Sequence, residues 1–376
     1  MNARPPQSET EERVAPLAGR LLERIRQEGA ITFRDWMEAA LYDETQGYYA
    51  RRDLMRWGRA GDYRTSAERT PLFAATFARY FAALYEELGA PSRWQIVEAG
   101  AGAGAFARGV LETLERDYPH VFSATLYVID EVSMDARERA RKLLAPYGNR
   151  TEFRRLDEID APTEACVIFS NELLDAFPVH RIVMCDGRLR ELCVGVSEAG
   201  EFVWTEREPT THLLAAHFER MGVVLAEGQI AEVNLDAEWW MERAARSFRR
   251  GYLVAVDYGA EAIELYGAPH RLAGTLRGFS RHKFSDDVLA HPGERDLTTT
   301  VNWTQIRAAG ERAGLKTVTL EPQDKFLLHA GALEQLELLT RRAESEAAKI
   351  SLRLGAREMI LPGGMSESFQ VLMQKK

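Results

Sequence analysis

The sequence has few cysteines, no long hydrophobic run and no concentration of positive charge, and each shortage excludes a class of protein. Its three cysteines among 376 residues show no metal-binding or redox spacing, so we expect reduced thiols in the cytoplasm. No apolar run approaches the roughly 20 residues that span a bilayer. The acidic N-terminal segment resembles neither a signal peptide nor a transit peptide. We therefore expect a cytoplasmic protein with no membrane partner.

Positive charge is also scarce relative to negative charge. The 48 Lys and Arg residues are outnumbered by 57 Asp and Glu residues, which gives a net charge of −9. No Lys/Arg cluster recurs at a spacing typical of nucleic-acid binding, so we expect no nucleic-acid partner. The eight histidines include no H-x-x-x-H pair, and we predict no metal site. An acidic protein of this kind is compatible with a basic substrate.

The most informative segment present is a glycine-rich turn that follows the apolar stretch Trp94–Val97. Gly100, Gly102 and Gly104 alternate with alanines, and Glu98 stands two residues before the first of them. Glycines allow a tight turn and a close approach of the backbone to a ligand, because no Cβ intrudes. A helix is predicted to follow, with its free N–H groups directed at that ligand. The G-x-G-x-G spacing and the preceding glutamate favour S-adenosylmethionine (SAM) over NAD.

From residue 94 onward the hydrophobic pattern alternates between strands and helices. Near-continuous apolar strands are typical of a parallel sheet that is buried on both faces, so we predict an α/β, doubly wound, mostly parallel sheet with an antiparallel C-terminal edge. Residues 181–240 interrupt the alternation with two predicted hairpins and a helix. The predicted strands are 94–98, 125–130, 151–155, 165–170, 252–256 and 369–373, and the predicted helices are 16–27, 34–41, 105–116, 134–145 and one that begins at Pro71.

Polar residues follow two further predicted strands, and in a doubly wound sheet such strand ends form the ligand site. Asp130 and Glu131 end one strand, and either carboxylate could accept hydrogen bonds from the ribose hydroxyls of an adenosine-type ligand. Asn171, Glu172 and Asp175 end another, where they would face the reactive end of the cofactor. Glu172 could bind and polarise a guanidinium group in a bidentate manner. The alternative is structural, with Asn171 capping a helix and Glu172 in its first turn.

Several short motifs occur in a fixed order and together resemble a known family. They resemble the MidA family of SAM-dependent methyltransferases, which is related to a mitochondrial complex I assembly factor, over about residues 31–335. The family implies a class I, Rossmann-like methyltransferase fold, SAM as cofactor, and methylation of a protein arginine side chain. The motifs are Gly47-Tyr48-Tyr49, Gly61-Asp62-Tyr63-x-Thr65-Ser66, Glu98-x-Gly-x-Gly-x-Gly, Asn171-Glu172-x-x-Asp175-Ala176-x-Pro178, Asp257-Tyr258-Gly259, Gly274-Thr275-Leu276, His282 and Pro292-Gly293-Glu294-x-Asp296-Leu297-Thr298.

The resemblance also implies roles for individual residues. Gly61, Asp62 and Thr65 would cover the cofactor from the N-terminal side. Glu98, Gly100, Gly102 and Gly104 would form the cofactor loop, with Asp130 and Glu131 at the ribose and Glu131 as the family's contact. Asn171 and Glu172 would lie at the methyl-transfer site, with Asn171 also touching the cofactor, and His282 and Asp296 would line the substrate side. Ala101 and Ala103 replace the proline and the basic residue that the family usually carries between these glycines.

These observations lead to one prediction with three alternatives. We predict a SAM-dependent methyltransferase that acts on a protein arginine, such as one in a respiratory complex I subunit, and the oligomeric state stays open, a homodimer included. The alternatives are an N-methyltransferase for another protein or a small molecule, a non-catalytic SAM-binding assembly chaperone, and an NAD-dependent oxidoreductase. The predicted units are a disordered N-terminus (1–12), a helical cap with a cofactor-covering loop (13–92), a SAM-binding core (93–180), an inserted substrate lobe (181–250) and the completion of the core sheet (251–376).

Overall fold

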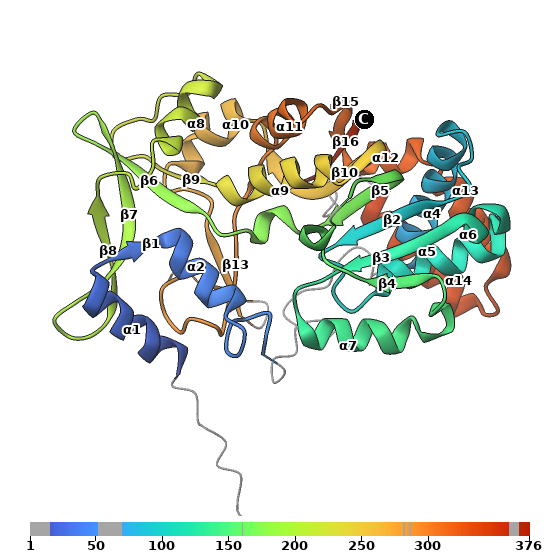
Figure 1. Cartoon of the computed structure of the whole chain (residues 1–376), viewed down its shortest axis with the longest axis horizontal. Coiled ribbons are helices and arrows are strands. Elements are labelled where there is room, and N and C mark those ends of the chain that lie inside the picture. The colour runs from blue at the N-terminus through green and yellow to red at the C-terminus, as the bar shows by residue number, and fades with distance from the viewer. Residues whose placement is uncertain (1–15, 52–69, 160, 281–282, 286, 361–367) are drawn as a thin grey trace, which may run out of the picture.

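The computed structural model describes residues 16–51, 70–159, 161–280, 283–285, 287–360 and 368–376. Within this part of the chain, a large sheet covered by helices stands beside a smaller lobe with its own sheet (Figure 1). The predicted disordered segment 1–12 lies outside the described residues, as does the stretch 52–69 of the predicted cap with its cofactor-covering loop. No helix in the described ranges combines the length and the apolar character needed to cross a membrane.

The large sheet has eight strands and is mostly parallel. Its strands are β2 (Trp94–Ala99), β3 (Thr125–Asp130), β4 (Thr151–Phe153), β5 (Thr163–Asn171), β10 (Phe248–Ala260), β14 (Val301–Asn302), β15 (Lys316–Pro322) and β16 (Phe369–Lys375). They are ordered β15-β16-β10-β5-β2-β3-β4, with β14 beside β10. Strand β16 runs antiparallel to both β10 and β15, whereas β2, β3, β4, β5 and β10 are mutually parallel. The predicted sheet type and its antiparallel C-terminal edge are confirmed.

The middle of β5, at the centre of this sheet, is apolar because helices cover both faces of the sheet. Cys166–Phe169 of β5 is almost completely buried. On one face Phe169 stacks on Phe106 with ring centroids 4.4 Å apart, and Phe77 packs against both rings. The helices that cover this face are α4 (Pro71–Glu87) and α5 (Ala105–Asp117), and those on the other face are α9 (Leu235–Arg246) and α11 (Trp303–Arg312).

The direction in which the chain crosses the sheet reverses between β2 and β5. From β2 the chain moves outward through β3 to β4, and it then returns to β5 and continues in the opposite direction to β10. Such a reversal opens a crevice at the carboxyl ends of the strands, where ligands bind in doubly wound sheets. The glycine-rich turn after β2 and the polar residues after β3, β5 and β10 all lie at this edge.

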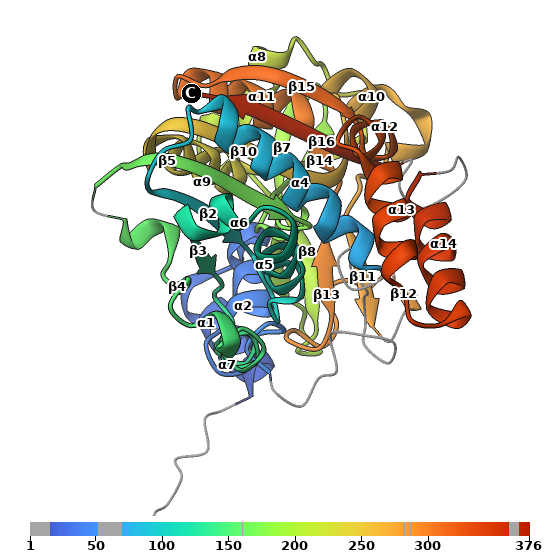
Figure 2. The ribbon, with the colours of Figure 1, turned by 90° about the vertical axis from the view of Figure 1, so that its right-hand side faces the viewer.

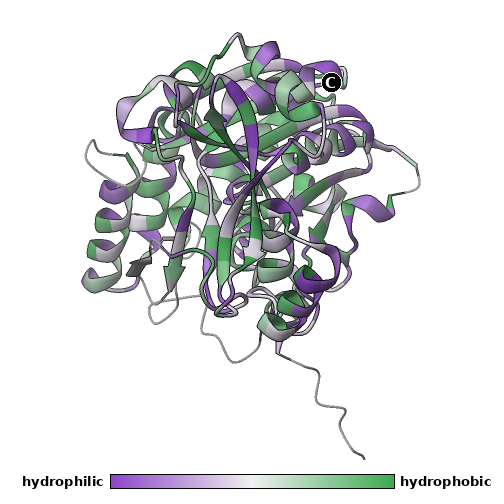
Figure 3. Ribbon diagram, turned by 90° about the vertical axis from the view of Figure 1, so that its left-hand side faces the viewer, coloured by the Kyte–Doolittle hydropathy of each residue, from purple (hydrophilic) through white to green (hydrophobic). Residues whose placement is uncertain are grey.

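The smaller lobe is built on an antiparallel five-stranded sheet. Its strands are β1 (Ile31–Thr32), β6 (His180–Cys185), β7 (Arg188–Val196), β8 (Phe202–Arg207) and β9 (Ile230–Val233), and its helices are α1 (Leu17–Glu28), α2 (Phe33–Tyr42), α8 (Leu213–Met221) and α10 (Ala262–Gly267). The strand order is β1-β7-β6-β9, with β8 on β7. Figure 3 views the molecule from this side and shows hydrophilic segments interspersed with hydrophobic ones along these strands. The two predicted hairpins are confirmed as β6–β7 and β7–β8.

The boundaries of the lobe differ from the predicted units. Helices α1 and α2 pack on the lobe sheet, where Phe33 and Trp36 are buried, while α4 packs on the large sheet. The predicted cap over 13–92 is therefore divided between the two parts. Ile31 is the reason, because it pairs with Val194 and so adds the N-terminal segment to the lobe sheet as β1. At the other limit, α9 lies within the predicted lobe but packs on the large sheet.

The remaining elements were not predicted individually, except for the helix after β3. Helices α13 and α14 lie side by side and contact α4 (Figure 2). A three-stranded sheet is ordered β12-β11-β13, and its strand β13 contacts α2 of the lobe and the turn η3 that follows β5. The bounds of these elements are α6 (Pro119–Ala124), α7 (Met134–Leu143), α12 (Gln323–His329), α13 (Ala332–Arg342), α14 (Glu346–Ile360), β11 (Arg277–Ser280), β12 (Lys283–Ser285), β13 (Asp296–Thr298), and the short 3-10 turns η1 (Ala145–Tyr147), η2 (Leu156–Glu158), η3 (Leu174–Ala176) and η4 (Pro269–Arg271).

Candidate active site

A cavity of about 1490 Å³ opens at the carboxyl ends of β2, β3, β5 and β10 and extends toward the lobe. Its lining includes residues from both parts of the molecule. Among the described residues, ten acidic side chains and four arginines line it. The cavity is therefore suited to a ligand that carries positive charge.

The glycine-rich turn after β2 forms one wall of this cavity. Gly100 and Gly102 line it and both have positive φ angles, of 70° and 53°. The Gly100 N–H donates to the carbonyl of Asp130 at 2.8 Å, which ties the turn to the end of β3. Backbone in this conformation suits glycine, because an L side chain there is strained.

Gly104 has a different role, since it does not line the cavity among the described residues. It precedes α5 with φ of 82°, and a Cβ there would lie 3.0 Å from Cβ of Ala140 on α7. Close packing between α5 and α7 therefore accounts for this glycine, which sequence reasoning placed in the cofactor loop.

Replacing Gly104 with alanine is expected to lower the free energy of unfolding by about 1–2 kcal/mol through strain of the left-handed backbone, and further through the close contact with Ala140. Urea unfolding measures this change. Gly89 is the matched control, since its φ is 80° and a Cβ there would meet nothing within 4 Å. If Gly89→Ala costs as much as Gly104→Ala, the contact with Ala140 has no separate effect.

Glu131 is buried beside the glycine turn and holds two backbone amides. Its Oε2 accepts a hydrogen bond from Gly102 N at 2.8 Å, and its Oε1 accepts one from Ser133 N at 2.7 Å. The Ser133 hydroxyl in turn donates to the carbonyl of Tyr49 at 2.6 Å. Asp130 also lines the cavity, and burial raises the pKa of its carboxyl to about 6. Both carboxyls that sequence reasoning offered for the ribose therefore border the cavity, with Glu131 nearer to Gly102.

Glu98 is buried at the end of β2. Its Oε2 accepts a hydrogen bond from the Tyr127 hydroxyl at 2.7 Å, and burial raises the pKa of its carboxyl to about 8. A carboxyl that is protonated when folded and ionised when unfolded makes the folded state less stable as pH rises. Its stabilising contribution is complete below the unfolded pKa, near 4.3, and is lost as pH rises through about 8.

Replacing Glu98 with glutamine is expected to remove part of this pH dependence. The wild-type free energy of unfolding should fall relative to that of Glu98→Gln by up to about 1.4 kcal/mol per pH unit between pH 5 and 8. Glutamine keeps an oxygen that can accept from Tyr127. Urea unfolding of both proteins without ligand at several pH values measures the difference, and parallel curves would show that Glu98 is ionised in the folded state.

The end of β5 carries Asn171 and Glu172, the two residues predicted to lie at the reactive end of the cofactor. Both line the cavity. Asn171 Nδ2 donates to Glu172 Oε1 at 3.0 Å, while Asn171 Oδ1 is buried without a hydrogen-bond partner in the described part of the chain. Glu172 has a positive φ of 52°, and its N–H donates to the carbonyl of Val256 on β10 at 2.9 Å. The predicted alternative, a helix capped by Asn171, is not formed, because only the short turn η3 follows.

Two buried carboxyls, Asp175 and Asp257, lie behind this strand end. Asp257 Oδ2 accepts hydrogen bonds from the N–H groups of residues 173–175 at 2.9–3.4 Å, and its Oδ1 accepts from Tyr258 N at 2.9 Å. Burial, followed by the charge of Glu172, raises the pKa of the Asp257 carboxyl to about 8, and these backbone donors partly oppose that rise. Burial, followed by the charge of Asp257, raises the pKa of Asp175 well above its usual range. Asp175 Oδ2 accepts from the Tyr258 hydroxyl at 2.7 Å, and its Oδ1 is buried with no hydrogen-bond partner among the residues that the structure describes.

Tyrosines from the N-terminal segment complete the site. The Tyr49 hydroxyl donates to Asp296 Oδ1 at 2.9 Å, and the Tyr42 hydroxyl donates to the carbonyl of Ala176 at 3.0 Å. Both tyrosines and Asp296 line the cavity. The lobe thus supplies one wall of the site, and β13, which carries Asp296, closes it toward the sheet.

The structure brings most of the predicted residues to this one cavity. Those that line it are Glu98, Gly100, Gly102, Asp130, Glu131, Asn171, Glu172 and Asp296. Gly61, Asp62, Thr65 and His282 lie outside the described residues, and their roles stay predictions. Asp236 and Trp240 of α9 also line the cavity, and they were not predicted from the sequence. Their i, i+4 spacing places them on one face of a helix, but it does not show what that face contacts.

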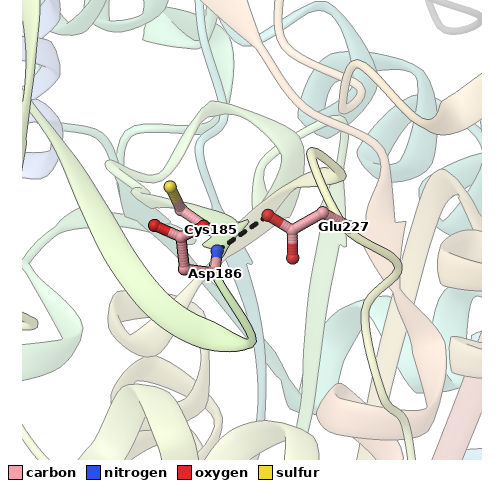
Figure 4. Close-up of side chains that lie close together, drawn as sticks. All are labelled: Cys185, Asp186 and Glu227. Carbon is pink, nitrogen blue, oxygen red and sulfur yellow. Dashed lines mark hydrogen bonds between the residues drawn. The ribbon is translucent and has the colours of Figure 1, made fainter.

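One further group of metal-ligand type residues lies at the turn between β6 and β7, where the ligand atoms of Cys185, Asp186 and Glu227 are within 4.8 Å of one another (Figure 4). Both carboxylate oxygens of Glu227 accept backbone N–H groups of this turn, from Asp186 at 2.7 Å and from Gly187 at 3.2 Å. The hairpin turn therefore accounts for the cluster.

Comparison with known families identifies the class of protein to which this site belongs. Residues 76–320 match the model of a family described as S-adenosyl-L-methionine-dependent methyltransferase. The chain belongs to this methyltransferase family. The match includes the glycine turn, the ends of β3 and β5, and strands β6 to β9 of the lobe.

The methyltransferase is also similar to curated proteins over almost its whole length. It is 25% identical over 382 residues to a *Drosophila melanogaster* protein named protein arginine methyltransferase NDUFAF7 homolog, mitochondrial, covering 95% of this chain and 84% of that protein. It is 26% identical over 390 residues to the *Homo sapiens* protein arginine methyltransferase NDUFAF7, mitochondrial, covering 95% of this chain and 82% of that protein. The predicted resemblance to this group is confirmed.

Two crystal structures from *Burkholderia thailandensis* share the fold of the methyltransferase. One, bound to S-adenosyl-homocysteine, has a TM-score of 0.85 and 29% identity over 96% of this chain and 92% of that chain. The other, a native structure, has a TM-score of 0.83 and 28% identity over 96% of this chain and 91% of that chain. The predicted fold class and SAM as cofactor are confirmed.

The residues of the methyltransferase fit this cofactor. The turn through Gly100 and Gly102 brings backbone to the cavity, and Glu131, with Asp130 beside it, would hold the ribose hydroxyls. The volume of about 1490 Å³ exceeds that of a pocket for one small ligand, which is about 300–1,000 Å³. Cofactor and acceptor side chain therefore both have room.

Proposed function

We propose that this SAM-dependent methyltransferase transfers the methyl group to the guanidinium of an arginine side chain in a protein. The observation that carries the proposal is a buried acceptor atom at the end of β5, Asn171 Oδ1, which has no hydrogen-bond partner among the described residues and stands beside Glu172. An unpaired buried acceptor is costly unless a ligand supplies a donor. A guanidinium supplies five N–H donors and positive charge.

The surroundings and the relatives support the same acceptor. Acidic residues outnumber arginines in the cavity lining, and Tyr42, Tyr49 and Trp240 add aromatic surface on which a guanidinium can stack. The curated relatives are named protein arginine methyltransferases. An amine acceptor would use fewer of these oxygens, which makes another N-methyltransferase the second candidate.

The chain's own residues would act by binding, orientation and proton transfer. The bound cofactor supplies a methyl group on a positively charged sulfur. Asn171 Oδ1 and the Glu172 carboxylate would accept N–H groups of the guanidinium and fix its plane. Methylation leaves one proton too many on a guanidinium, and Glu172 is the carboxylate we assign to receive it.

Labelled methyl transfer tests this function. Purified protein is incubated with methyl-labelled SAM and a cell protein extract, and the hydrolysed proteins are analysed for methylated amino acids. Label in methylarginine is expected. Label in methyllysine or in small molecules would favour the second candidate, and S-adenosylhomocysteine binding without transfer would favour the SAM-binding chaperone.

The cellular compartment is a separate proposal. The three cysteines are free and two of them are buried, which is compatible with the reducing cytoplasm that we propose. The names of the curated relatives place those proteins in mitochondria. Fractionation of cells that express the full chain distinguishes the two compartments.

A further inference from the structure

Two arginines that line the cavity, Arg271 and Arg277, have unused hydrogen-bonding capacity. Among the described residues, Arg271 Nη1 is buried without a hydrogen-bond partner, although its Nη2 pairs with Glu264 Oε1 at 3.5 Å. The guanidinium of Arg277 has no ion pair in the described part of the chain. Both residues line the cavity. By contrast, Arg155, on another wall, is paired with Asp157 at 3.2 Å.

Strand pairing aims Arg277 into the cavity. In the antiparallel pair β11–β13, Arg277 is opposite Thr298 and Phe279 is opposite Asp296. Directly opposed side chains lie on the same face of a sheet, and these four residues all line the cavity. The intervening Leu297 faces the other way and is buried in the lobe core. One sheet face therefore presents a cation at Arg277 and an acid at Asp296.

The segment that joins the two arginines is held in place by other charged groups. Glu232 of β9 accepts hydrogen bonds from Thr275 N at 2.6 Å and from the Thr275 hydroxyl at 3.1 Å. Arg181 of β6 donates to Glu232 at 3.2 Å and to the carbonyl of Ala273 at 3.0 Å. Arg271 and Arg277 thus flank an anchored turn, which reduces the ordering cost of binding a ligand there.

Arg277 lies close to the proposed acceptor site. Thr299, next to β13, donates its N–H to the carbonyl of Asp175 at 3.0 Å, and Asp175 accepts from Tyr258. One short strand therefore separates Arg277 from Asp175. An extended peptide advances about 3.3–3.6 Å per residue. A group bound by the two arginines would belong to a residue near the target arginine.

We infer that Arg271 and Arg277 form a subsite for the carboxylate of an aspartate or glutamate within about three residues of the target arginine. This inference rests on the proposed function, since it extends the same cavity. Arginine matches the geometry of a carboxylate and binds it through charge-assisted hydrogen bonds. The subsite would select among the many exposed arginines of cellular proteins.

A synthetic peptide pool tests the subsite. The pool has a fixed central arginine and flanking positions drawn from alanine, serine, glutamine, glutamate and lysine. It is methylated by the full-length protein with SAM, and methylated members are sequenced by mass spectrometry. Glutamate is expected to be about tenfold enriched over glutamine at one or more positions within three residues of the arginine.

Charge-reversal variants provide the specificity control. Arg271→Glu and Arg277→Glu are expected to abolish the glutamate enrichment and to favour lysine at the same positions. Arg357→Glu is the matched control, because Arg357 is exposed on α14 and does not line the cavity. S-Adenosylhomocysteine binding by each variant confirms that the variant is folded. If a variant does not fold, the residue preference measured with the wild-type protein still tests the subsite.

The outcomes separate the subsite from the proposed function. Methylated peptides without acid enrichment overturn the subsite and leave arginine methylation standing. A pool without any methylarginine also overturns the subsite as a determinant of peptide binding. Absence of methylarginine from the cell extract as well overturns the proposed function itself.

Discussion

Replacing Glu172 with glutamine is expected to lower the rate of methyl transfer by about a hundred- to ten-thousand-fold, the usual range for loss of a proton-transfer group. Glutamine has nearly the same size as glutamate and can still accept one hydrogen bond, so the variant removes mainly charge and basicity. Glu172 lines the cavity beside the unpaired Asn171 Oδ1, at the end of β5. Single-turnover transfer of labelled methyl to the protein extract measures the rate.

The comparison needs a variant with the same chemical change elsewhere. Glu198→Gln provides it, because Glu198 is exposed in the lobe and does not line the cavity. Glu198→Gln should transfer methyl at the wild-type rate, and Glu172→Gln should bind S-adenosylhomocysteine within about threefold of wild type. If Glu172→Gln transferred methyl at the wild-type rate, the proton acceptor would have to be another carboxyl, and Asp175 is the neighbouring candidate.

Replacing Glu131 with glutamine should weaken S-adenosylhomocysteine binding by about 10- to 100-fold. A hydrogen bond to a charged group contributes about 1.5–3 kcal/mol, and each 1.4 kcal/mol is a factor of ten in affinity. The two Glu131 oxygens already accept from Gly102 and Ser133. Glutamine would place an amide donor against one of these N–H groups and also disturb the glycine turn. Calorimetric titration measures the affinity.

Asp130→Asn is the matched comparison for Glu131→Gln. Both side chains line the cavity one residue apart, and the sequence alone left open which of them contacts the ribose. We expect the smaller loss for Asp130→Asn, because Asp130 is less closely tied to the glycine turn. A larger loss for Asp130→Asn would reverse the assignment. Wild-type affinity in both variants would show that the cofactor is held without either carboxyl.

The elements that position the cofactor could be predicted from the sequence because they are locally encoded. Residues 166–169 form an apolar run that is typical of a strand buried on both faces, and it became the centre of the large sheet. The glycines after residue 99 indicated the turn directly. Thr70 caps α4 and Pro71 lies in its first turn, so the start of this helix could also be predicted from the sequence.

The lobe could be predicted only in part, because its pairings join residues far apart in the chain. Ile31 and Thr32 form a two-residue strand that is recognisable only from its partners Val194 and Cys193. The pairing of Arg277 with Thr298 likewise depends on a sheet of three very short strands. Helix α9 shows amphipathic spacing in the sequence, but only the fold shows that Asp236 and Trp240 meet the cavity.

The positions of the acidic residues could likewise be predicted from the sequence, whereas their protonation states could not. Asn171 and Glu172 were expected at the reactive end because they follow a predicted strand. The raised pKa values of Asp175 and Asp257 could not be expected, since they arise mainly from burial, which only the folded chain produces. A residue type shows which proton chemistry is available, and its neighbours decide the protonation state.

The positive φ of Glu172 means that the sequence with the highest folding stability would differ from the sequence that is active. A side chain held in that backbone region costs about 1–2 kcal/mol, which glycine would not incur. Selection for thermal stability alone would therefore favour glycine at this position, and the carboxylate would be lost. Laboratory evolution of a hardier protein should keep residue 172 fixed and seek its gains elsewhere.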